Sequence, residues 1–417
     1  MLPPLYLQKD TLRFHLPAEC WPALRHLPWN DPLEQWDARG IRFLHIRSGL
    51  SRHVVRFIET QSLRFAIKET SGAAAVRESS SYSHLRVLGL PTLEPVGIVL
   101  RDDGLLSAET PAGIQTERQE SGFLVTRLME NVIPDAFLFR RAFRRENRQR
   151  IWDAVIQLFV RLHARGVYWG DASLANMLIH FATNTIPELG FRTTLQAILA
   201  DAETVELHPS LSPTRRMADV EFFLESMAWT EADLTASGIV REPVLTVDDE
   251  RYFKERYQAR FDLEQEKRAF RLLTRIDVES LLGDFDLKGQ GDILLNHIQE
   301  HRWYLGERTG GEVSLERAAE DWYRTIFRPV CRVFSEEGLT ELFPESTASA
   351  LYLRIMEHKY YMSQRLGRDV GLLAALQDYM HTVAPEAKGE RTLGAILQSV
   401  LEMFRGGPGD ARHPLLR

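Results

Sequence analysis

The stretch from Leu162 to Ile179, LHARGVYWGDASLANMLI, restricts the fold of this chain more than any other part of it. Apolar residues recur at helical spacing from Trp152 up to this stretch and predict an amphipathic helix. Two glycines then break the helical pattern, and an apolar run begins at Met177. The pattern predicts a helix, a loop and a short strand, in which the loop presents the carboxylate of Asp171 and the carboxamide of Asn176.

Bulk composition limits the class of protein. With 417 residues the chain is long enough for two or three domains. A hydrophobic content of 44% indicates an ordinary soluble globular protein, and a net charge of −7 argues against a general nucleic-acid binder. The two cysteines, Cys20 and Cys331, are too far apart in sequence to indicate a disulfide framework or a Cys-ligated zinc site. We expect no signal peptide, no membrane span and a cytoplasmic location.

The first third of the chain has a strand-rich pattern. Residues 1–38 are rich in Pro and Trp, which predicts an extended segment with short helical turns that packs on the domain behind it. Three short runs rich in β-branched and aromatic residues predict a strand meander: 41–49, 52–59 and 63–69. The following elements are a predicted helix over 71–89, predicted strands over 96–100 and 122–128, and a break at 129–134 that is typical of a hinge.

Polar residues with catalytic chemistry occur at the ends of these elements. They are Lys68 on the third strand, Glu78 on the helix, Asp171 and Asn176 in the loop, and Asp201 directly after the apolar run 197–200. Glu69 competes with Glu78 as a partner for Lys68. Because Glu69 follows Lys68 directly, it points to the opposite face of the strand, and Glu78 is the better candidate.

In these features the region from about 40 to 235 resembles the protein-kinase-like superfamily. Phe65-Ala66-Ile67-Lys68 is similar to the V-A-I-K strand of kinases, and Asp171 and Asn176 have the spacing of their catalytic loop. The resemblance implies ATP and Mg²⁺ as cofactors and gives each residue a role. Lys68, held by Glu78, would contact the α- and β-phosphates; Asp171 would lie at the acceptor hydroxyl; Asn176 and Asp201 would bind the metal ion.

The glycine-rich loop that covers the phosphates in kinases is reduced here to residues 47–52, with the single glycine Gly49. Gly49 permits a close backbone approach, and Ser51 is a candidate phosphate contact beside it, as are Ser48 and Arg52. The expected cofactor-binding residues are therefore Lys68, Gly49 and Ser51.

Other departures from the kinase pattern concern the acceptor. Trp169-Gly170 replaces the His-Arg before the catalytic Asp, Ser173 replaces a following Lys, and Asp201-Ala202-Glu203 replaces D-F-G. These variants resemble aminoglycoside and other small-molecule kinases. They favour a small molecule or a saccharide over a protein as the hydroxyl acceptor.

A closer resemblance covers most of the chain. The motifs LPWNDPLEQW, GVYWGDASLANMLI, FDLKGQGD and EHRWYL are similar to an uncharacterised bacterial group often labelled lipopolysaccharide kinase-like.

Asp219, on a predicted helix over 217–234, has two interpretations: a buried acid that braces the catalytic loop, or a charge at a helix N-terminus. Asp284-Phe285-Asp286 resembles D-F-G but follows a helix, and we interpret it as a decoy.

The C-terminal half contains an internal repeat. Residues 298–321 align without gaps to 355–378, and His301/His358 and Asp321/Asp378 are among the shared positions. Each copy predicts a helix, a Gly-containing turn and a second helix. The Glu-His pair of each copy suggests either a metal site or, preferably, a structural pair buried between the repeats. DNA binding by these helices would need a basic second helix, which the sequence lacks.

The sequence therefore predicts an α+β chain: a bilobal protein-kinase-like fold followed by an all-α domain with a duplicated helix-turn-helix unit. The expected parts are an N-terminal extension (1–38), an N-lobe (39–131), a C-lobe (132–240) and a helical C-terminal domain (241–417). We expect an ATP- and Mg²⁺-dependent phosphotransferase with a hydroxyl acceptor, and a protein partner for the repeat domain. The alternative is a nucleotide-binding pseudokinase that acts as a regulatory or scaffold module. No nucleic-acid partner is expected.

Overall fold

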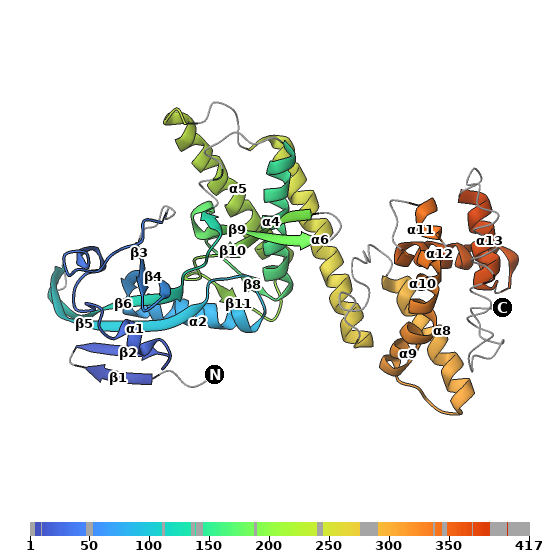
Figure 1. Cartoon of the computed structure of the whole chain (residues 1–417), viewed down its shortest axis with the longest axis horizontal. Helices are drawn as coiled ribbons and strands as arrows, with labels where there is room; N and C mark the ends of the chain where they lie inside the picture. The colour runs from blue at the N-terminus through green and yellow to red at the C-terminus, as the bar shows by residue number, and fades with distance from the viewer. Residues whose placement is uncertain are drawn as a thin grey trace. The chain divides into compact units, whose positions relative to one another are not determined.

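Two compact units make up the chain. The structure is a computed structural model (Figure 1) that describes residues 5–9, 11–46, 53–110, 113–134, 145–186, 190–239, 245–275, 291–336, 338–343, 348–368 and 370–383, with positions 138 and 398. Unit 1 is Met1–Phe261 and unit 2 is Asp262–Arg417. The division falls inside α6 (Val247–Thr274), whereas the sequence predicted the helical domain from residue 241. The predicted domain bounds stay predictions.

Unit 1 begins with a six-stranded antiparallel sheet in the order β1-β2-β5-β6-β4-β3. The strands are β1 (Leu5–Lys9), β2 (Leu12–Leu16), β3 (Val54–Thr60), β4 (Leu63–Ser71), β5 (Pro95–Thr110) and β6 (Gly113–Arg127). Lys68 on β4 pairs with Val55 of β3 on one side and with Leu124 of β6 on the other. The backbone of Lys68 is thus fixed on both sides by neighbouring strands.

The helix α2 (Gly72–Val87) follows β4 without a connecting loop. Ser71 ends the strand and also caps the helix, because its hydroxyl accepts the backbone N–H of Ala74. Ala75, Glu78 and Tyr82 recur at helical spacing and are buried, so this face of α2 packs against the sheet. Glu78 therefore points inward from a helix whose start is set by the strand that carries Lys68.

The N-terminal segment joins this sheet and covers one of its faces. β2 pairs with β5, and the short helices α1 (Trp21–Leu24) and η1 (Leu33–Gln35) follow. The rings of Trp29 and Trp36 are fully buried, with Trp29 edge-on to Phe123 of β6 at 5.3 Å between ring centroids. The segment therefore packs on the sheet through aromatic side chains as well as through strand pairing.

The predicted strand over 41–49 is not formed by its described residues, 41–46. Phe43 makes an isolated bridge to Ile58, and the Leu44 N–H donates to the Phe57 carbonyl at 2.7 Å. The prediction was wrong because the apolar side chains of this segment pack on a hydrophobic cluster, while its backbone makes only an isolated bridge to the sheet. Ile41 and Phe43 lie against the hydrophobic cluster that contains both buried tryptophans.

The second part of unit 1 is mainly helical. Its elements are β7 (Val132–Pro134), α4 (Arg145–Ala164), β8 (Val167–Tyr168), η2 (Leu174–Asn176), β9 (Met177–Ile186), β10 (Gly190–Leu199), β11 (Glu206–Leu207) and α5 (Pro213–Ala236), followed by α6. Residues 181–186 and 190–196 continue β9 and β10 as paired antiparallel strands. Within this part of unit 1, α4 packs against β10.

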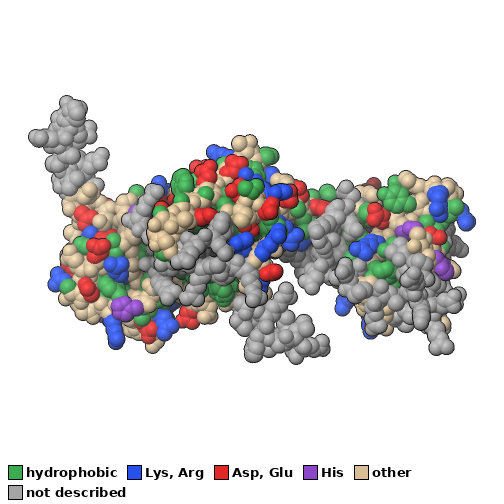
Figure 2. Space-filling model, turned by 90° about the horizontal axis from the view of Figure 1, so that it is seen from above, with side chains coloured by type: hydrophobic (Ala, Val, Ile, Leu, Met, Phe, Trp, Pro, Cys, Tyr) green, Lys and Arg blue, Asp and Glu red, His purple; other side chains and the backbone are tan. Residues whose placement is uncertain are grey.

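Unit 2 is helical in all its described elements. They are α8 (Gly291–Thr309), α9 (Leu315–Trp322), the π-helical turn η3 (Tyr323–Phe327), α10 (Arg328–Glu336), α11 (Leu339–Leu342), α12 (Ala348–Leu366) and α13 (Leu372–Val383). Asp284-Phe285-Asp286 lies outside the described residues. No helix in the described ranges has the length and apolar character required to span a bilayer. Acidic and basic side chains are interspersed on the face that Figure 2 shows.

The two stretches of the predicted repeat contain matching hydrogen bonds. His301 Nε2 lies 2.9 Å from Asp321 Oδ2, and His358 Nε2 lies 2.8 Å from Asp378 Oδ2. Each pair joins a first helix to a second one, which agrees with a structural role for the histidines. The duplication itself stays a prediction.

Candidate active site

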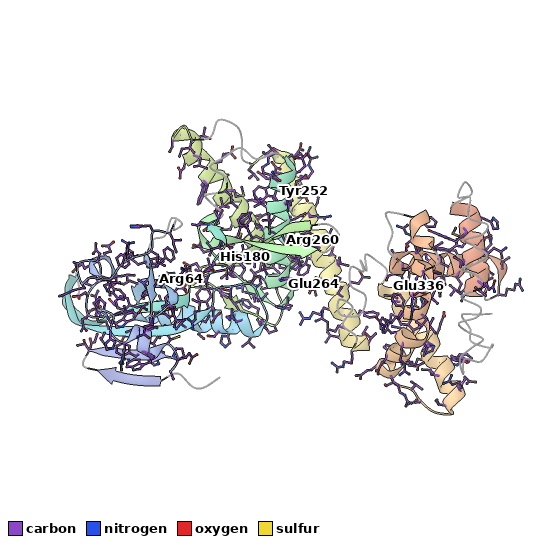
Figure 3. The ribbon with its side chains drawn as sticks, viewed as in Figure 1. Arg64, His180, Tyr252, Arg260, Glu264 and Glu336 are labelled. Carbon is purple, nitrogen blue, oxygen red and sulfur yellow. The ribbon has the colours of Figure 1, made fainter. Side chains whose placement is uncertain are left out.

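A cavity of about 460 Å³ lies between the sheet and the helical part of unit 1. Its walls include the apolar side chains of Val55 and Ala66 from the sheet and Leu178 from β9. Residues 126–132, which connect the two parts, form one edge. Arg64, labelled in Figure 3, lies at the same edge and forms an ion pair with Glu130 at 2.8 Å. A flat apolar ring fits between walls of this kind, and one end of the cavity is charged.

The charged end of the cavity is built around Lys68. Its ammonium nitrogen lies 2.9 Å from Glu78 Oε2 and 2.9 Å from Asp201 Oδ2. The side chain of Lys68 is only 11% exposed and that of Glu78 only 1%. Lys68 and Glu78 thus meet Asp201, which is distant in the sequence, in one partly buried cluster. Glu69 points away, as expected, and accepts the backbone N–H of Leu33 at 2.7 Å.

Two carboxylates share a single ammonium in this cluster, which affects the proton on Glu78. Burial, followed by the nearby charge of Asp201, raises the pKa of Glu78 to about 7. The Tyr82 hydroxyl lies 2.6 Å from the Ala200 carbonyl and 3.0 Å from Glu78 Oε1. A hydroxyl has one hydrogen, so Tyr82 donates to one of these two acceptors at a time. Donation to Glu78 lowers the pKa of that carboxyl, against the larger effect of burial.

Tyr82 was missed by the sequence analysis, although a signal for it was present. It lies four residues after Glu78 on the same helix, and residues at this spacing share a helix face. Burial raises the pKa of Tyr82 well above its ordinary value, so its hydroxyl stays protonated. Tyr82 therefore links the Lys68 cluster to the backbone directly before Asp201.

The predicted loop brings Asp171 and Asn176 together. The Asn176 side-chain amide donates to the Asp171 backbone carbonyl at 3.0 Å, and the Ala200 N–H donates to the Asn176 carbonyl at 2.9 Å. The loop is thus tied to itself and to the strand that precedes Asp201. Asn176 and Asp201 line the same cavity, and the side chain of Asp171 is partly exposed.

Asp219 on α5 fixes the backbone of this loop through hydrogen bonds. Its carboxylate is 1% exposed and accepts the backbone N–H groups of Trp169 at 2.7 Å and Gly170 at 2.8 Å. Of the two interpretations from sequence, the bracing acid is therefore the one observed. Trp169 is buried, and its indole N–H donates to the Asp201 carbonyl at 2.9 Å. This residue, seen in the sequence only as a departure from the kinase pattern, links the catalytic-type loop to Asp201.

The donor atoms beside Lys68 suit a magnesium ion. Asn176 uses its amide nitrogen in the loop bond, which leaves the amide oxygen on the other side of the group. That oxygen and the Asp201 carboxylate are hard oxygen donors on the wall of one cavity. Within the described ranges no group of three or more His, Cys, Asp and Glu side chains is placed to hold a metal ion. The two oxygen donors on the cavity wall would leave the other positions of a Mg²⁺ shell to phosphate oxygens and water.

Gly49 and Ser51, the other two candidate cofactor contacts, lie outside the described residues. The neighbouring His53 is described, and its Nε2 lies 3.5 Å from Glu203 Oε2. Arg77 of α2 approaches the same carboxylate at 3.8 Å. Glu203, which replaces the glycine of D-F-G, thus contacts both the start of β3 and the helix α2.

These features define the class of the fold. An antiparallel sheet and one helix carry Lys68 and Glu78, a connecting segment follows, and a helical part carries Asp171, Asn176 and Asp201. Unit 1 has a protein-kinase-like fold with a β-rich N-lobe and a helical C-lobe, and unit 2 is all-α over its described elements. The bilobal kinase-like fold followed by a helical unit, as expected from the sequence, is confirmed, and the duplicated helix-turn-helix unit stays a prediction.

Comparisons with known proteins give a family for part of the chain. Residues 288–384, within unit 2, match the family model described as "Domain of unknown function (DUF4032)". The chain is similar to the structure of WaaP in complex with acyl carrier protein: identity 17%, TM-score 0.31, coverage 58% of this chain and 95% of that one. A search among curated proteins found no match.

Two further solved structures are similar at the same level. One is the Rio2 kinase–ADP/Mg²⁺–phosphoaspartate complex from Chaetomium thermophilum, with 14% identity, a TM-score of 0.31 and coverage of 60% of this chain and 72% of that one. The other is aminoglycoside-3′-phosphotransferase of type VIII, with 15% identity, a TM-score of 0.31 and coverage of 57% and 97%.

Proposed function

We propose that this protein is an ATP- and Mg²⁺-dependent phosphotransferase that moves the γ-phosphate to a hydroxyl acceptor. One observation carries the proposal: the Lys68 ammonium lies 2.9 Å from both Glu78 and Asp201 at the inner end of a cavity that Asn176 also lines. A cation next to oxygen donors in one cavity supports the binding of nucleotide phosphates and a metal ion there.

Lys68 would neutralise charge on the α- and β-phosphates. Bound nucleotide would draw the ammonium from Asp201 toward phosphate oxygens, while Glu78 keeps the side chain extended along the cavity floor. Asn176 and Asp201 would then hold Mg²⁺, which supplies charge neutralisation between the phosphates. Only small side-chain movements are needed, because all these groups already lie in or beside the same cavity.

Asp171 would orient the acceptor hydroxyl and take its proton. Its position depends on backbone contacts of the loop, namely the Asn176 amide and the N–H groups that Asp219 accepts. The acceptor is a small molecule, a saccharide or a protein hydroxyl, in our order of preference. The protein partner expected for the C-terminal repeat stays a prediction.

The test of this function is Asp171→Asn, which keeps the shape of the side chain but removes its basicity. We expect phosphotransfer to fall about 10²–10⁴-fold, the range for loss of a general base, while ATP affinity stays within about twofold because the cavity walls are unchanged. Turnover is measured with γ-labelled ATP over an acceptor panel, and affinity by calorimetry. Asp233→Asn, an exposed change on α5, is the matched control. Undiminished turnover in Asp171→Asn would reject the assignment.

A nucleotide-binding pseudokinase is the alternative. The observation in its favour is Glu203, whose contacts with His53 and Arg77 lie beside Asp201, at a position where kinases have glycine. γ-Labelled ATP with Mg²⁺ separates the two functions. Binding without hydrolysis, self-labelling or transfer across the acceptor panel would favour the pseudokinase, in which unit 2 would recruit a partner.

A further inference from the structure

A buried hydrogen-bond chain links α6 to the catalytic-type loop. The Tyr257 hydroxyl on α6 lies 2.6 Å from His163 Nδ1 on α4, and His163 Nε2 lies 3.1 Å from Asp219 Oδ2. Arg216 Nη1 donates to the same Tyr257 hydroxyl at 3.2 Å. His163, Asp219 and Tyr257 are each at most 2% exposed, so the bonds are made without competition from bulk water.

The donors and acceptors along this chain have one consistent assignment. Asp219 is an acceptor only, and it also takes the N–H groups of Trp169 and Gly170, so His163 must present a protonated Nε2 to it. Burial lowers the pKa of His163, so the ring is neutral and its Nδ1 is unprotonated. Tyr257 then donates to Nδ1 and accepts from Arg216, whose guanidinium can only donate.

We propose that Tyr257 is a positioning residue for the loop that carries Asp171. Its hydroxyl fixes the tautomer and ring orientation of His163. That ring in turn fixes the Asp219 carboxylate, which sets the backbone of Trp169 and Gly170 directly before Asp171. Without the hydroxyl, a buried nitrogen of His163 loses its donor and a buried Arg216 loses an acceptor, and both are free to seek other partners.

The matched pair of variants is Tyr257→Phe and Tyr252→Phe. Tyr252 lies on the same helix (Figure 3), and its hydroxyl donates to Asp153 Oδ1 on α4 at 3.1 Å. Each change removes one hydroxyl between α6 and α4. The chain of bonds to the loop starts at Tyr257. Tyr252 instead contacts the Asp153 oxygen that Arg256 and Arg260 of α6 also approach, at 3.5 and 3.0 Å.

Hydrogen exchange on the full-length chain is the first measurement. We expect Tyr257→Phe to speed exchange of the Trp169 and Gly170 amides about tenfold or more, and Tyr252→Phe to leave it as in the wild type. Equal exchange in Tyr257→Phe and wild type overturns the proposal. So does an equal increase in both variants, which would show general loosening of α6.

The second measurement is kinetic, and this part alone rests on the proposed function. Tyr257→Phe should lower kcat about tenfold with KM for ATP within about twofold, because the loop moves and the cavity walls do not. If the wild-type protein transfers no phosphate, the proposed function is rejected. The hydrogen-exchange result then decides alone whether Tyr257 positions the loop. A wild type with phosphotransfer and an unchanged kcat in Tyr257→Phe would remove the positioning role alone.

The tautomer is tested on the unaltered protein, so the proposal does not depend on the folding of a variant. Nitrogen NMR of ¹⁵N-histidine-labelled protein should show His163 with Nε2 protonated and Nδ1 unprotonated; the opposite tautomer contradicts the chain of bonds. His163→Gln offers a donor and an acceptor in place of both ring nitrogens and should retain more loop protection than His163→Leu. Equal loss of protection in these two variants would argue for a packing role only.

Discussion

His297 in unit 2 shows how burial of a single residue controls stability against pH. The residue is 6% exposed, and its Nδ1 has no hydrogen-bond partner among the described residues. Burial, followed by the charge of Lys359, lowers the pKa of His297 to about 3. In the folded chain the His297 ring therefore stays unprotonated below pH 6.5. In the unfolded chain the same ring has its ordinary pKa of about 6.5 and binds a proton there. Acid favours the unfolded chain.

The sign of this effect gives a testable pH dependence. The contribution of His297 to folding is fully present above pH 6.5 and is lost as pH falls from 6.5 toward 3. At pH 5 the loss is on the order of 2 kcal/mol. His297→Leu should reduce the fall in the free energy of unfolding of unit 2 between pH 7.5 and 5 by about this amount, measured by denaturant titration.

The control for this measurement is His381→Leu, because His381 is exposed on α13 in the same unit. We expect it to keep the pH dependence of the wild type. An unreduced loss of stability in His297→Leu between the two pH values would show that other groups determine the acid sensitivity.

The residues of the site differ in how far sequence predicts them. The order of Lys68, Glu78 and Asp201 on strand, helix and strand end was sufficient to expect a cluster, and the structure brings them within hydrogen-bond distance. Tyr82 was not predicted, although its partner Glu78 lies four residues earlier on the same helix. His163 was not predicted because its partners, Asp219 and Tyr257, come from elements far away in the sequence. Spacing along one helix shows which face a residue occupies but not what lies opposite.

At the scale of elements, the contact of α2 with β6 fixes the position of Glu78. Gly122 on β6 lies under the helix, and a Cβ built there would lie 2.5 Å from the Cβ of Ala75. Carbon atoms do not approach so closely, so Gly122→Ala must displace α2 or the strand. We expect a loss of about 1–3 kcal/mol in the free energy of unfolding and weaker ATP binding, measured by denaturant titration and calorimetry.

A second substitution identifies the clashing atom. Ala75→Gly removes the nearest atom, so Gly122→Ala should cost less in its presence, and the double variant should regain part of the ATP affinity. The Gly72 Cα and the Ser71 carbonyl oxygen, each 3.0 Å from the added Cβ, stay in place. Gly311→Ala is the control, because a Cβ at Gly311 meets nothing within 4 Å and its φ is not positive. If the losses in the free energy of unfolding from the changes at Gly122 and Ala75 are additive, the contact between these two residues does not fix the position of α2.

The predicted elements also differ in reliability for physical reasons. The helix over 71–89 and the strand over 63–69 were predicted within a few residues, because a cap and a strand pattern mark their ends. The prediction of a strand over 41–49 was wrong. A run of apolar residues also occurs in a segment that packs on a hydrophobic core without pairing as a strand. The joining of the N-terminal segment to the sheet depended on β2 meeting β5, which local pattern does not encode.

At the scale of the whole molecule, the chain contains separate hydrophobic clusters in its two units. Clusters around Trp152 and around Trp29 lie in unit 1, and the cluster around Trp322 lies mainly in unit 2. We therefore expect calorimetry of the full chain to resolve two unfolding transitions. A non-hydrolysable ATP analogue with Mg²⁺ at 100 times its Kd should stabilise one of them by about 2.7 kcal/mol.

Only one transition should move, because the cavity is lined by residues of unit 1 alone. Lys68→Met provides the control, since it removes the cation at the phosphate end and should abolish the shift. If calorimetry shows a single transition and the ATP analogue shifts all of it, the two units unfold together. A shift confined to the transition of unit 2, which is identified as the transition whose acid sensitivity His297→Leu reduces, would place the nucleotide elsewhere.

The direct passage from β4 into α2 has a consequence for control of activity. In Ser71 the last residue of the strand and the cap of the helix are the same residue, and Gly122 lets the helix lie against the sheet. In the structure the pairing of Lys68 with Glu78 is already made. Under the proposed function, the protein would meet nucleotide with this pair assembled. Its output would follow the supply of nucleotide and acceptor, and the ATP affinity of Gly122→Ala measures how much that fixed geometry contributes.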